Sequence, residues 1–410
     1  MNQKLRQDAE RIVRAAIRAV SPDEAVRRAL SGCTLGKRVY LVAVGKAAWQ
    51  MAQAALCQMA FPPQGGIVIT KYGHVRGELP GVVCFEAGHP VPDNNTYLAT
   101  QAVLDMTADL CPEDCVLFLL SGGGSALFEK PLVAAEEMEA VTRQLLACGA
   151  DIAEINTIRK RLSGVKGGRF ARWCQPARVE AVILSDVLGD SPAMIASGPV
   201  TEDPLPADAA EKIIFRYGLH ISPAALFCLK KELPKQLCHV HTQVIGSVKE
   251  LCLAAAKECR RLGYEPLLLT DHLDCEAREA GRFLADILYT HSGQGEKMAF
   301  LAGGETVVHL TGNGKGGRNQ ELALAAAEGV AGLPDAAVIS VGSDGTDGPT
   351  DAAGGYVDGD SKNLLTEMGF EISAVLAKND AYPALRAAGG LIVTGPTGTN
   401  VNDIAIGLIG

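Results

Sequence analysis

The segment Val116–Ala126 has the sequence VLFLLSGGGSA and joins a short apolar run to a glycine-rich run bounded by two serines. An unbroken apolar run of this length is typical of a buried strand in a parallel sheet. Ligands of such sheets bind just beyond the carboxyl ends of the strands, and glycines there let backbone N–H groups approach an anion. A plain strand-to-helix turn is the alternative. The anion-binding residues predicted from this segment are Ser121, Gly122, Gly123, Gly124 and Ser125.

Lys46 lies in a second glycine turn, Gly45-Lys46, which follows the predicted strand Arg38–Val44 and opens a helix. An ammonium group beside a helix N-terminus favours an anionic ligand. The strand would deliver this pair to the carboxyl edge of the sheet. The position therefore predicts a functional lysine, with a solvated lysine at a helix start as the alternative.

Two further basic clusters lie among glycines, GNGKGGRNQEL and IRKRLSGVKGG. In the first cluster, Arg318 offers planar, bidentate recognition of a phosphate or carboxylate. A surface turn and a solvated run of charges are the alternatives for the two clusters. The further residues that they contribute as substrate- or nucleotide-binding candidates are Gly314, Lys315, Asn319, Arg159 and Lys166.

Carboxylates follow predicted strands at Glu180–Leu184 and Ala337–Val341, and another stands in the run Gly303-Gly304-Glu305-Thr306. Carboxylate oxygens suit Mg²⁺, although the spacing after Asp344 does not fit an EF-hand. Each acid could instead cap a turn. Taken with the basic glycine loops, they fit phosphoryl transfer, which needs charge neutralisation, positioning and a metal. The assignments that follow are a catalytic role for Asp186 and Mg²⁺ binding by Asp344, Glu305 and Asp347.

Two nucleotide-binding signatures can be tested directly. A P-loop is excluded because Gly45-Lys46 is followed by Ala47 and Tyr40 stands where the first glycine should be. A G-x-G-x-x-G pattern does occur, beginning at Gly312. It follows a predicted strand over Thr306–Leu310 and precedes a helix, which is the context of a dinucleotide-binding fingerprint. Binding of a nicotinamide dinucleotide therefore stays open as an alternative.

The composition describes a globular chain of 410 residues, long enough for two domains. With 38 Lys and Arg against 47 Asp and Glu, the net charge of −9 argues against a nucleic acid or an anionic membrane as partner. The 12 cysteines form no C-x-x-C pair, which argues against structural zinc and favours reduced thiols in the cytoplasm. No apolar run reaches the length of a membrane span.

Strand and helix patterns alternate through both halves of the chain, which predicts α/β architecture with a mostly parallel, Rossmann-like sheet in the first half. The stretch from Pro234 to His241 is the predicted boundary. The predicted domains are 1–238 and a smaller α/β domain, 239–410. The closing strands lie around Val401–Leu408. The sequence leaves open whether they return to the side of the first domain.

Seven motifs, in order along nearly the whole chain, resemble those of the D-glycerate 2-kinases whose C-terminal half is called the MOFRL domain. They are VAVGKAAWQMA, LFLLSGGGSALFEKP, INTIRKRLSGVKGGRFA, LSDVLGDSPAMIASGPV, GGETVVHLTGNGKGGRNQEL, VGSDGTDGPTDAAGGYVDG and TGPTGTNVND. The resemblance implies transfer of the γ-phosphoryl group of ATP to the 2-hydroxyl of D-glycerate with Mg²⁺, in a cleft between two α/β domains. It also implies that Lys46 and Arg318 are central to catalysis.

Some proteins of this family carry the label hydroxypyruvate reductase, so an NAD(P)H-dependent reductase is the alternative activity. A non-catalytic sensor of sugar acids is a third possibility, although the sequence has no DNA-binding element. The expected partners are a small-molecule substrate, D-glycerate, with no nucleic acid and no membrane. A homodimer is expected on base rates, and the expected location is the cytoplasm.

Overall fold

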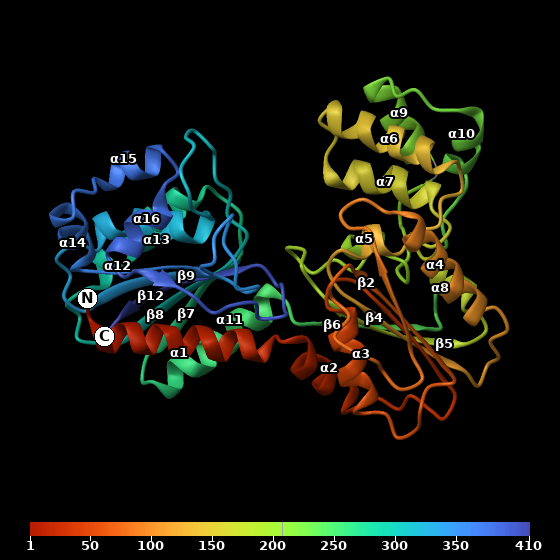
Figure 1. Ribbon diagram of the computed structural model, residues 1–410, viewed down its shortest axis with the longest axis horizontal. Helices are drawn as coiled ribbons and strands as arrows, with labels where there is room; N and C mark the ends of the chain where they lie inside the picture. The colour runs from red at the N-terminus through yellow and green to blue at the C-terminus, as the bar shows by residue number, and fades with distance from the viewer. Residues whose placement is uncertain (207) are drawn as a thin grey trace. The chain divides into compact units, whose positions relative to one another are not determined.

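The chain folds into two compact units in the computed structural model, which describes residues 1–206 and 208–410 (Figure 1). One unit comprises Ala25–Ile245, and the other combines Met1–Glu24 with Gly246–Gly410. This division differs from the predicted boundary between residues 238 and 239. The strand Val240–Ile245 completes the first sheet, and the N-terminal helix packs in the second unit.

The first unit contains a six-stranded sheet in which every neighbouring pair of strands is parallel, which confirms the predicted Rossmann-like sheet. The strand order is β3-β2-β1-β4-β5-β6. Chain direction across the sheet reverses between β1 and β4, and this switch point is where ligands of such folds bind. The strands are β1 Val39–Val44, β2 Gly65–Lys71, β3 Val83–Ala87, β4 Cys115–Leu120, β5 Arg178–Leu184 and β6 Val240–Ile245.

The helices of this unit form two groups with separate apolar cores. Those that pack around the sheet are α3 Ala48–Leu56, α4 Asn94–Met106, α5 Gly124–Leu127 and α8 Arg169–Trp173. Beneath them, the buried rings of Phe118, Phe128 and Phe170 contact one another. The second group forms a helical cluster of its own (Figure 1) and comprises α6 Ala135–Ala147, α7 Ile152–Leu162, α9 Asp208–Tyr217 and α10 Pro223–Leu229. A 3₁₀ turn covers Ile195–Ser197, and α2, Pro22–Leu30, spans the division between the units.

The second unit contains a mixed six-stranded sheet with the order β11-β10-β9-β12-β8-β7. Its last strand, β12, lies between β8 and β9 and is antiparallel to both, so the amino end of β12 meets their carboxyl ends. Asp403 consequently pairs with Gly304 and Gly342. The strands are β7 Glu265–Leu273, β8 Met298–Gly304, β9 Ala336–Gly342, β10 Gly354–Asp358, β11 Leu391–Ile392 and β12 Asp403–Ile409.

Two details of this sheet correct the sequence-based expectations. The predicted strand over Thr306–Leu310 is absent, since only a single bridge joins Val307 to Glu276. Strand β10 was not predicted, because it begins with two glycines, which rarely occur in a strand.

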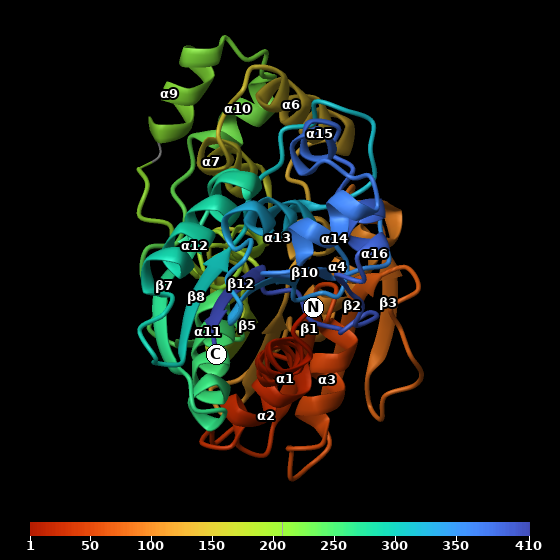
Figure 2. The ribbon, with the colours of Figure 1, turned by 90° about the vertical axis from the view of Figure 1, so that its left-hand side faces the viewer.

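Helices cover both faces of the second sheet (Figures 1 and 2). Helices α12 and α13 pack on one face, and α1 and α11 pack on the other. The helices of this unit are α1 Gln3–Ala19, α11 Val248–Arg261, α12 Ala277–His291, α13 Arg318–Gly329, α14 Ser361–Glu367, α15 Ile372–Ala377 and α16 Ala381–Ala387. Among the described residues, no helix is both long enough and apolar enough to cross a membrane.

Candidate functional site

The predicted lysine turn and the predicted serine–glycine loop meet at the switch point of the first sheet. The backbone N–H of Lys46 donates to the carbonyl of Gly122 over 2.9 Å, and that of Ala47 donates to Ser121 Oγ over 3.0 Å. Gly45 has a φ of 122°, and a Cβ at this position would collide with the backbone of Ser121. Glycine at position 45 therefore allows the turn after β1 and the loop after β4 to lie against each other.

The glycine loop presents backbone donors that the protein does not use. Among the described residues, no hydrogen bond to a protein acceptor is found for the N–H groups of Gly122, Gly123 and Gly124. Gly123 has a left-handed φ of 87°, which an L-side chain rarely adopts. Consecutive N–H groups without an intramolecular acceptor are well suited to bind an anion. The role predicted for the loop stays a prediction that this geometry permits.

Two titratable side chains flank the same loop. A Cβ on Gly122 would collide with the carboxylate of Asp186, so this predicted catalytic acid lies directly against the loop. A Cβ on Gly123 would lie 3.1 Å from His89 Nε2 and 3.2 Å from Lys46 Cγ. The sequence offered no metal-ligand spacing for His89 and left it unassigned. Its position after a strand, in Gly88-His89-Pro90, was the available signal.

A chain of hydrogen bonds fixes the far end of the loop. Ser197 Oγ donates to Asn156 Oδ1 over 2.8 Å, so its single proton is used. Ser125 is therefore the donor in its 3.1 Å contact with Ser197, and only lone pairs of Ser125 Oγ remain for a ligand. Arg159 donates to the carbonyl of Ser125 over 3.3 Å, which places this predicted binding residue at the loop.

Lys166, which was predicted to bind a ligand, is buried in an ion pair. Its ammonium group is fully buried, 2.7 Å from Glu129 Oε2 and 2.7 Å from the carbonyl of Phe128. Burial lowers the pKa of Lys166 and opposes the effect of Glu129. Arg161, in the same basic run, is also fully buried and donates to backbone carbonyls. Most of this run holds the core together and leaves Arg159 as its candidate for ligand contact.

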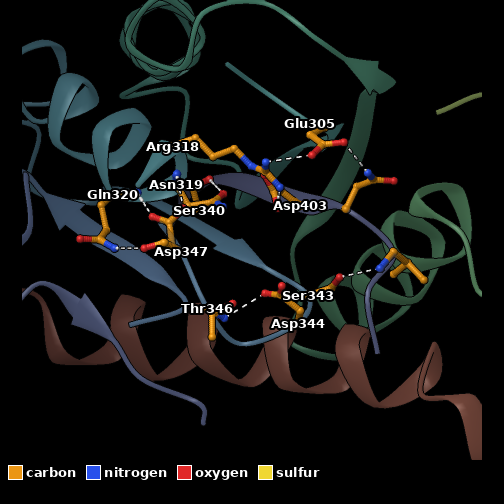
Figure 3. Close-up of polar contacts among 12 residues, drawn as sticks. Glu305, Arg318, Asn319, Gln320, Ser340, Ser343, Asp344, Thr346, Asp347 and Asp403 are labelled. Atoms are coloured by element: carbon orange, nitrogen blue, oxygen red, sulfur yellow. Dashed lines mark hydrogen bonds and ion pairs between the residues drawn. The ribbon is translucent and has the colours of Figure 1, made fainter. Parts of the chain in front are cut away.

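In the second unit, Arg318 lies between two carboxylates at the carboxyl edge of the sheet (Figure 3). Its guanidinium group binds Asp403 through two hydrogen bonds, of 2.5 and 3.1 Å, and Glu305 through a third of 2.9 Å. Asn402 donates to the other oxygen of Glu305 over 3.0 Å. Asp403 and Asn402 were not predicted as site residues, although both belong to the TGTNVND motif.

The electrostatics of this pair favour a charged guanidinium. Burial lowers the pKa of Arg318, but the hydrogen bonds and charge of Asp403 outweigh burial and raise it overall. Burial raises the pKa of Asp403 to about 6, against the opposing effect of Arg318. Both groups are therefore charged at pH 7, and with Glu305 the three side chains carry one net negative charge.

Asp347 caps the start of α13, where Asn319 and Gln320 lie (Figure 3). The carboxylate of Asp347 accepts from the backbone N–H groups of Asn319 and Gln320, over 3.1 and 2.8 Å. Asn319 is buried and accepts from Ser340 Oγ over 2.6 Å. It faces a small cavity that it shares with Ser340 and Asp403. The immediate role of Asn319 is thus to fix α13, which carries Arg318.

The glycines of the G-x-G-x-x-G pattern serve packing. A Cβ on Gly312 would collide with the backbone of Lys378, and a Cβ on Gly314 would lie 2.5 Å from Asp380 Cβ. The backbone N–H of Lys315 donates to Asp380 over 2.7 Å, and its ammonium group lies 4.4 Å from the centre of the Tyr382 ring. Because no strand precedes this loop, it is not a dinucleotide-binding fingerprint. Lys315 itself is exposed and accessible to a ligand.

The three predicted Mg²⁺ ligands do not form a metal site. Glu305 pairs with Arg318, Asp347 caps α13, and Asp344 accepts from the N–H of Thr346 over 2.9 Å. Among the described residues, no group of three or more His, Cys, Asp or Glu side chains could hold a metal ion. Each acid has a partner within the protein, so these residues do not fit a protein-built Mg²⁺ site.

The chain matches two family models and has closely similar relatives. Residues 8–230 match a domain of unknown function, DUF4147, and residues 298–403 match the MOFRL family. A D-glycerate 2-kinase of Thermotoga maritima is 49% identical, with 99% of each chain covered. A glycerate 2-kinase of Pyrococcus horikoshii is 38% identical, covering 99% of this chain and 97% of the relative.

Solved structures agree with these matches. The crystal structure of a glycerate kinase from Thermotoga maritima superposes with a TM-score of 0.97 at 48% identity, covering the whole of both chains. The match covers both units of the chain. The chain therefore belongs to the glycerate 2-kinase family that pairs a DUF4147 domain with a MOFRL domain.

Proposed function

We propose that this chain transfers the γ-phosphoryl group of ATP to the 2-hydroxyl of D-glycerate, giving 2-phospho-D-glycerate and ADP. The observation that carries the proposal is the loop after β4. In the described residues, this loop presents three backbone N–H groups for which no protein acceptor is found, beside Lys46 at the switch point of a parallel sheet. The names of the full-length relatives support the same activity.

Each charged group has a defined task in this proposal. The N–H groups of Gly122, Gly123 and Gly124 and the ammonium of Lys46 stabilise negative charge on the transferring phosphoryl group or on the carboxylate of glycerate. Arg318 is proposed to bind an anionic group by taking a ligand oxygen in place of exposed Glu305. Ser125, which offers only lone pairs, accepts a hydrogen bond from a substrate hydroxyl.

ATP is the proposed donor, and a Mg²⁺ requirement remains a prediction. Mg²⁺ usually keeps several waters and binds largely through substrate phosphates, so activity need not depend on a carboxylate cage of the protein. Use of ATP is consistent with a cytoplasmic enzyme. The predicted homodimer and the predicted absence of a nucleic-acid partner likewise remain predictions.

Phosphorylation of D-glycerate by the purified protein tests the proposal directly. The product is detected with enolase and pyruvate kinase, and no mutase is added. Because enolase accepts the 2-phosphate and not the 3-phosphate, a signal identifies the position of transfer. ADP release without this signal would point to the 3-phosphate or to another acceptor.

Lys46→Ala tests the role of the loop. Loss of one preorganised charge-stabilising group is expected to lower kcat about 100-fold or more. Lys37→Ala is a control in the same unit, because Lys37 is exposed and precedes β1 at the other end of the strand. Turnover by Lys46→Ala close to that of the wild type would refute the assignment of this loop.

The alternative of a hydroxypyruvate reductase has lost its main sequence support, because the glycine pattern that suggested a dinucleotide packs against Lys378 and Asp380. The alternative is still easily tested. Oxidation of NADH by hydroxypyruvate, with no ADP formed from ATP and glycerate, would establish the reductase in place of the kinase.

A further inference from the structure

His89 occupies a fixed position beside the unused N–H groups of the glycine loop. It follows β3, and the turn that carries it is held by Gly88, where a Cβ would lie 3.0 Å from Asp93 Cγ. Asp93 in turn caps α4. The imidazole reaches Gly123, where a Cβ would lie 3.0 Å from Cδ2 and 3.1 Å from Nε2 of the ring. The ring is thus brought to the switch point from the edge strand of the sheet.

Within the described part of the chain, the ring of His89 differs in its hydrogen bonding from three of the other histidines of this unit. His74, His239 and His241 each use a ring nitrogen in a hydrogen bond, to the carbonyl of Lys46, the carbonyl of Ala171 and the carboxylate of Glu180 respectively. Among the described residues, no hydrogen bond is found for either nitrogen of His89. Because the ring is only partly buried, both nitrogens remain accessible to a ligand beside the candidate binding loop.

The surroundings of His89 favour the neutral imidazole. Burial lowers its pKa, and the charges that act on it, Lys46, Lys71 and His74, lower it further. These groups come from the turn after β1, from the end of β2 and from the loop that follows β2. A neutral ring keeps a lone pair on one nitrogen and can accept a proton near pH 7.

We propose that His89 is a further catalytic residue, which accepts the proton of the substrate hydroxyl that attacks the γ-phosphoryl group. In this step the O–H bond breaks and an N–H bond forms on the imidazole. The hydroxyl oxygen forms a bond to the γ-phosphorus, and the bond from phosphorus to the bridging oxygen breaks. ADP leaves with that electron pair, and the imidazolium later releases its proton to water. The proposal rests on the proposed kinase function.

The position of Lys46 supports separate roles for the two residues, with His89 accepting the proton and Lys46 stabilising negative charge. Its Cγ and His89 Nε2 lie on the same side of Gly123, 3.2 and 3.1 Å from the place where a Cβ would be. An ammonium beside the ring would attract the anionic reactant and also disfavour the imidazolium before reaction. The proton acceptor, His89, and the charge-stabilising group, Lys46, would then both be in place before the hydroxyl attacks the phosphoryl group.

The experiment compares wild type, His89→Gln and His89→Ala in the coupled D-glycerate assay from pH 5 to 9. Glutamine keeps a hydrogen-bonding amide but cannot accept the proton. We expect both variants to lose about 100-fold or more in kcat, with a much smaller change in the KM for ATP. The acidic limb of the wild-type kcat/KM profile, with an apparent pKa below 6.5, should disappear in both. Added imidazole should partly restore His89→Ala.

The controls separate this proposal from the proposed function. Wild-type protein that fails to phosphorylate D-glycerate refutes the kinase itself. If wild type is active and His89→Gln stays within about threefold with an unchanged acidic limb, the role of His89 alone is refuted. Loss of activity with an unchanged limb and no rescue by imidazole also refutes proton transfer, provided that the variants keep the wild-type Tm. His220→Ala is the matched control, because His220 is exposed in the same unit and should keep full activity.

Discussion

Arg318 donates to two carboxylates of unequal accessibility, and this inequality indicates how it could bind a ligand. The side chain of Glu305 is 45% exposed, whereas that of Asp403 is 10% exposed. An anionic ligand can therefore replace Glu305 more easily than Asp403. Asp403 would hold the guanidinium plane while the remaining N–H groups face the ligand.

Replacement of Arg318 by lysine tests whether the planar geometry matters. Lysine keeps the charge but cannot donate two parallel hydrogen bonds to Asp403 while contacting a ligand. We expect Arg318→Lys to lower kcat/KM about 100-fold or more in the coupled assay. Arg282→Lys, an exposed arginine paired with Glu279, should change it less than twofold. Equal effects of the two substitutions would contradict a specific role for Arg318.

The buried carboxylate of Asp403 also predicts how stability depends on pH. Its pKa is raised to about 6 in the folded chain, above its ordinary value of 3.8. The folded state therefore binds this proton more tightly than the unfolded state. Ionisation of Asp403 then costs stability as the pH rises from about 4 to about 6, by on the order of 1–3 kcal/mol.

The direction of this pH dependence of stability can be measured by urea unfolding. The quantity to compare is the difference in urea midpoint between wild type and Asp403→Asn at several pH values. The wild type should lose stability relative to Asp403→Asn as the pH rises through this window. A wild type that instead gains relative stability would mean that Arg318 lowers the pKa of Asp403 below its unfolded value.

At the scale of elements, the buried Lys166–Glu129 pair joins the turn after α7 to the segment after α5. Removing one partner of a buried ion pair leaves an uncompensated charge, at a cost of about 3–5 kcal/mol. We therefore expect Lys166→Met to lower the Tm strongly, and Lys166→Met with Glu129→Leu to recover much of the loss.

Lys212→Met is the matched control, since its pair with Asp208 is exposed and should contribute less than about 1 kcal/mol. Thermal unfolding of the four proteins decides between the two roles of Lys166. A Lys166→Met variant with an unchanged Tm and a raised KM for glycerate would restore the binding role predicted from the sequence.

The sequence was sufficient to locate candidate site residues wherever they directly follow a strand. The loops after β1 and β4 were predicted to be functional because both strands are buried apolar runs of a parallel sheet, whose carboxyl ends share one edge. The same rule failed for Asp403. It precedes its strand, and only the antiparallel direction of β12 brings it to that edge.

Other failures have a common physical cause. A glycine that accommodates a ligand and a glycine that accommodates another backbone look alike in sequence, so Gly314 was assigned to binding although it packs against Asp380. Lys166 was assigned to binding because it lies in a basic, glycine-rich run, and the sequence does not reveal its pairing with remote Glu129. A better assignment of either residue would have required knowledge of which segments meet in space.

At the scale of the whole molecule, the N-terminal helix is a structural part of the second unit, although the segment that follows it belongs to the first. The apolar face of α1 is buried beside α11, and Tyr264 donates to Asp8 over 3.0 Å. The backbone N–H of Asn2 donates to Asp358 over 2.7 Å. The two chain ends lie close together in Figure 1, and a Cβ on Gly410 would lie 2.6 Å from Leu5 Cδ2. The first residues of the chain thus complete a core built from its last 165 residues.

This arrangement predicts that a destabilising substitution in α1 lowers the stability of the C-terminal segment more than that of the segment directly following α1. Ile12 is fully buried in α1, and Ile12→Ala should cost about 2–5 kcal/mol. Hydrogen exchange should then accelerate in β8, β9 and β12, while β1 and β4 keep their protection. Arg14→Ala, an exposed position on the same helix, should leave both sheets unchanged.

Faster exchange in β1 and β4 alone would instead place the stabilising contacts of α1 in the first unit. Faster exchange confined to the second sheet would mean that the DUF4147 match, which starts at residue 8, includes a helix that stabilises the other unit.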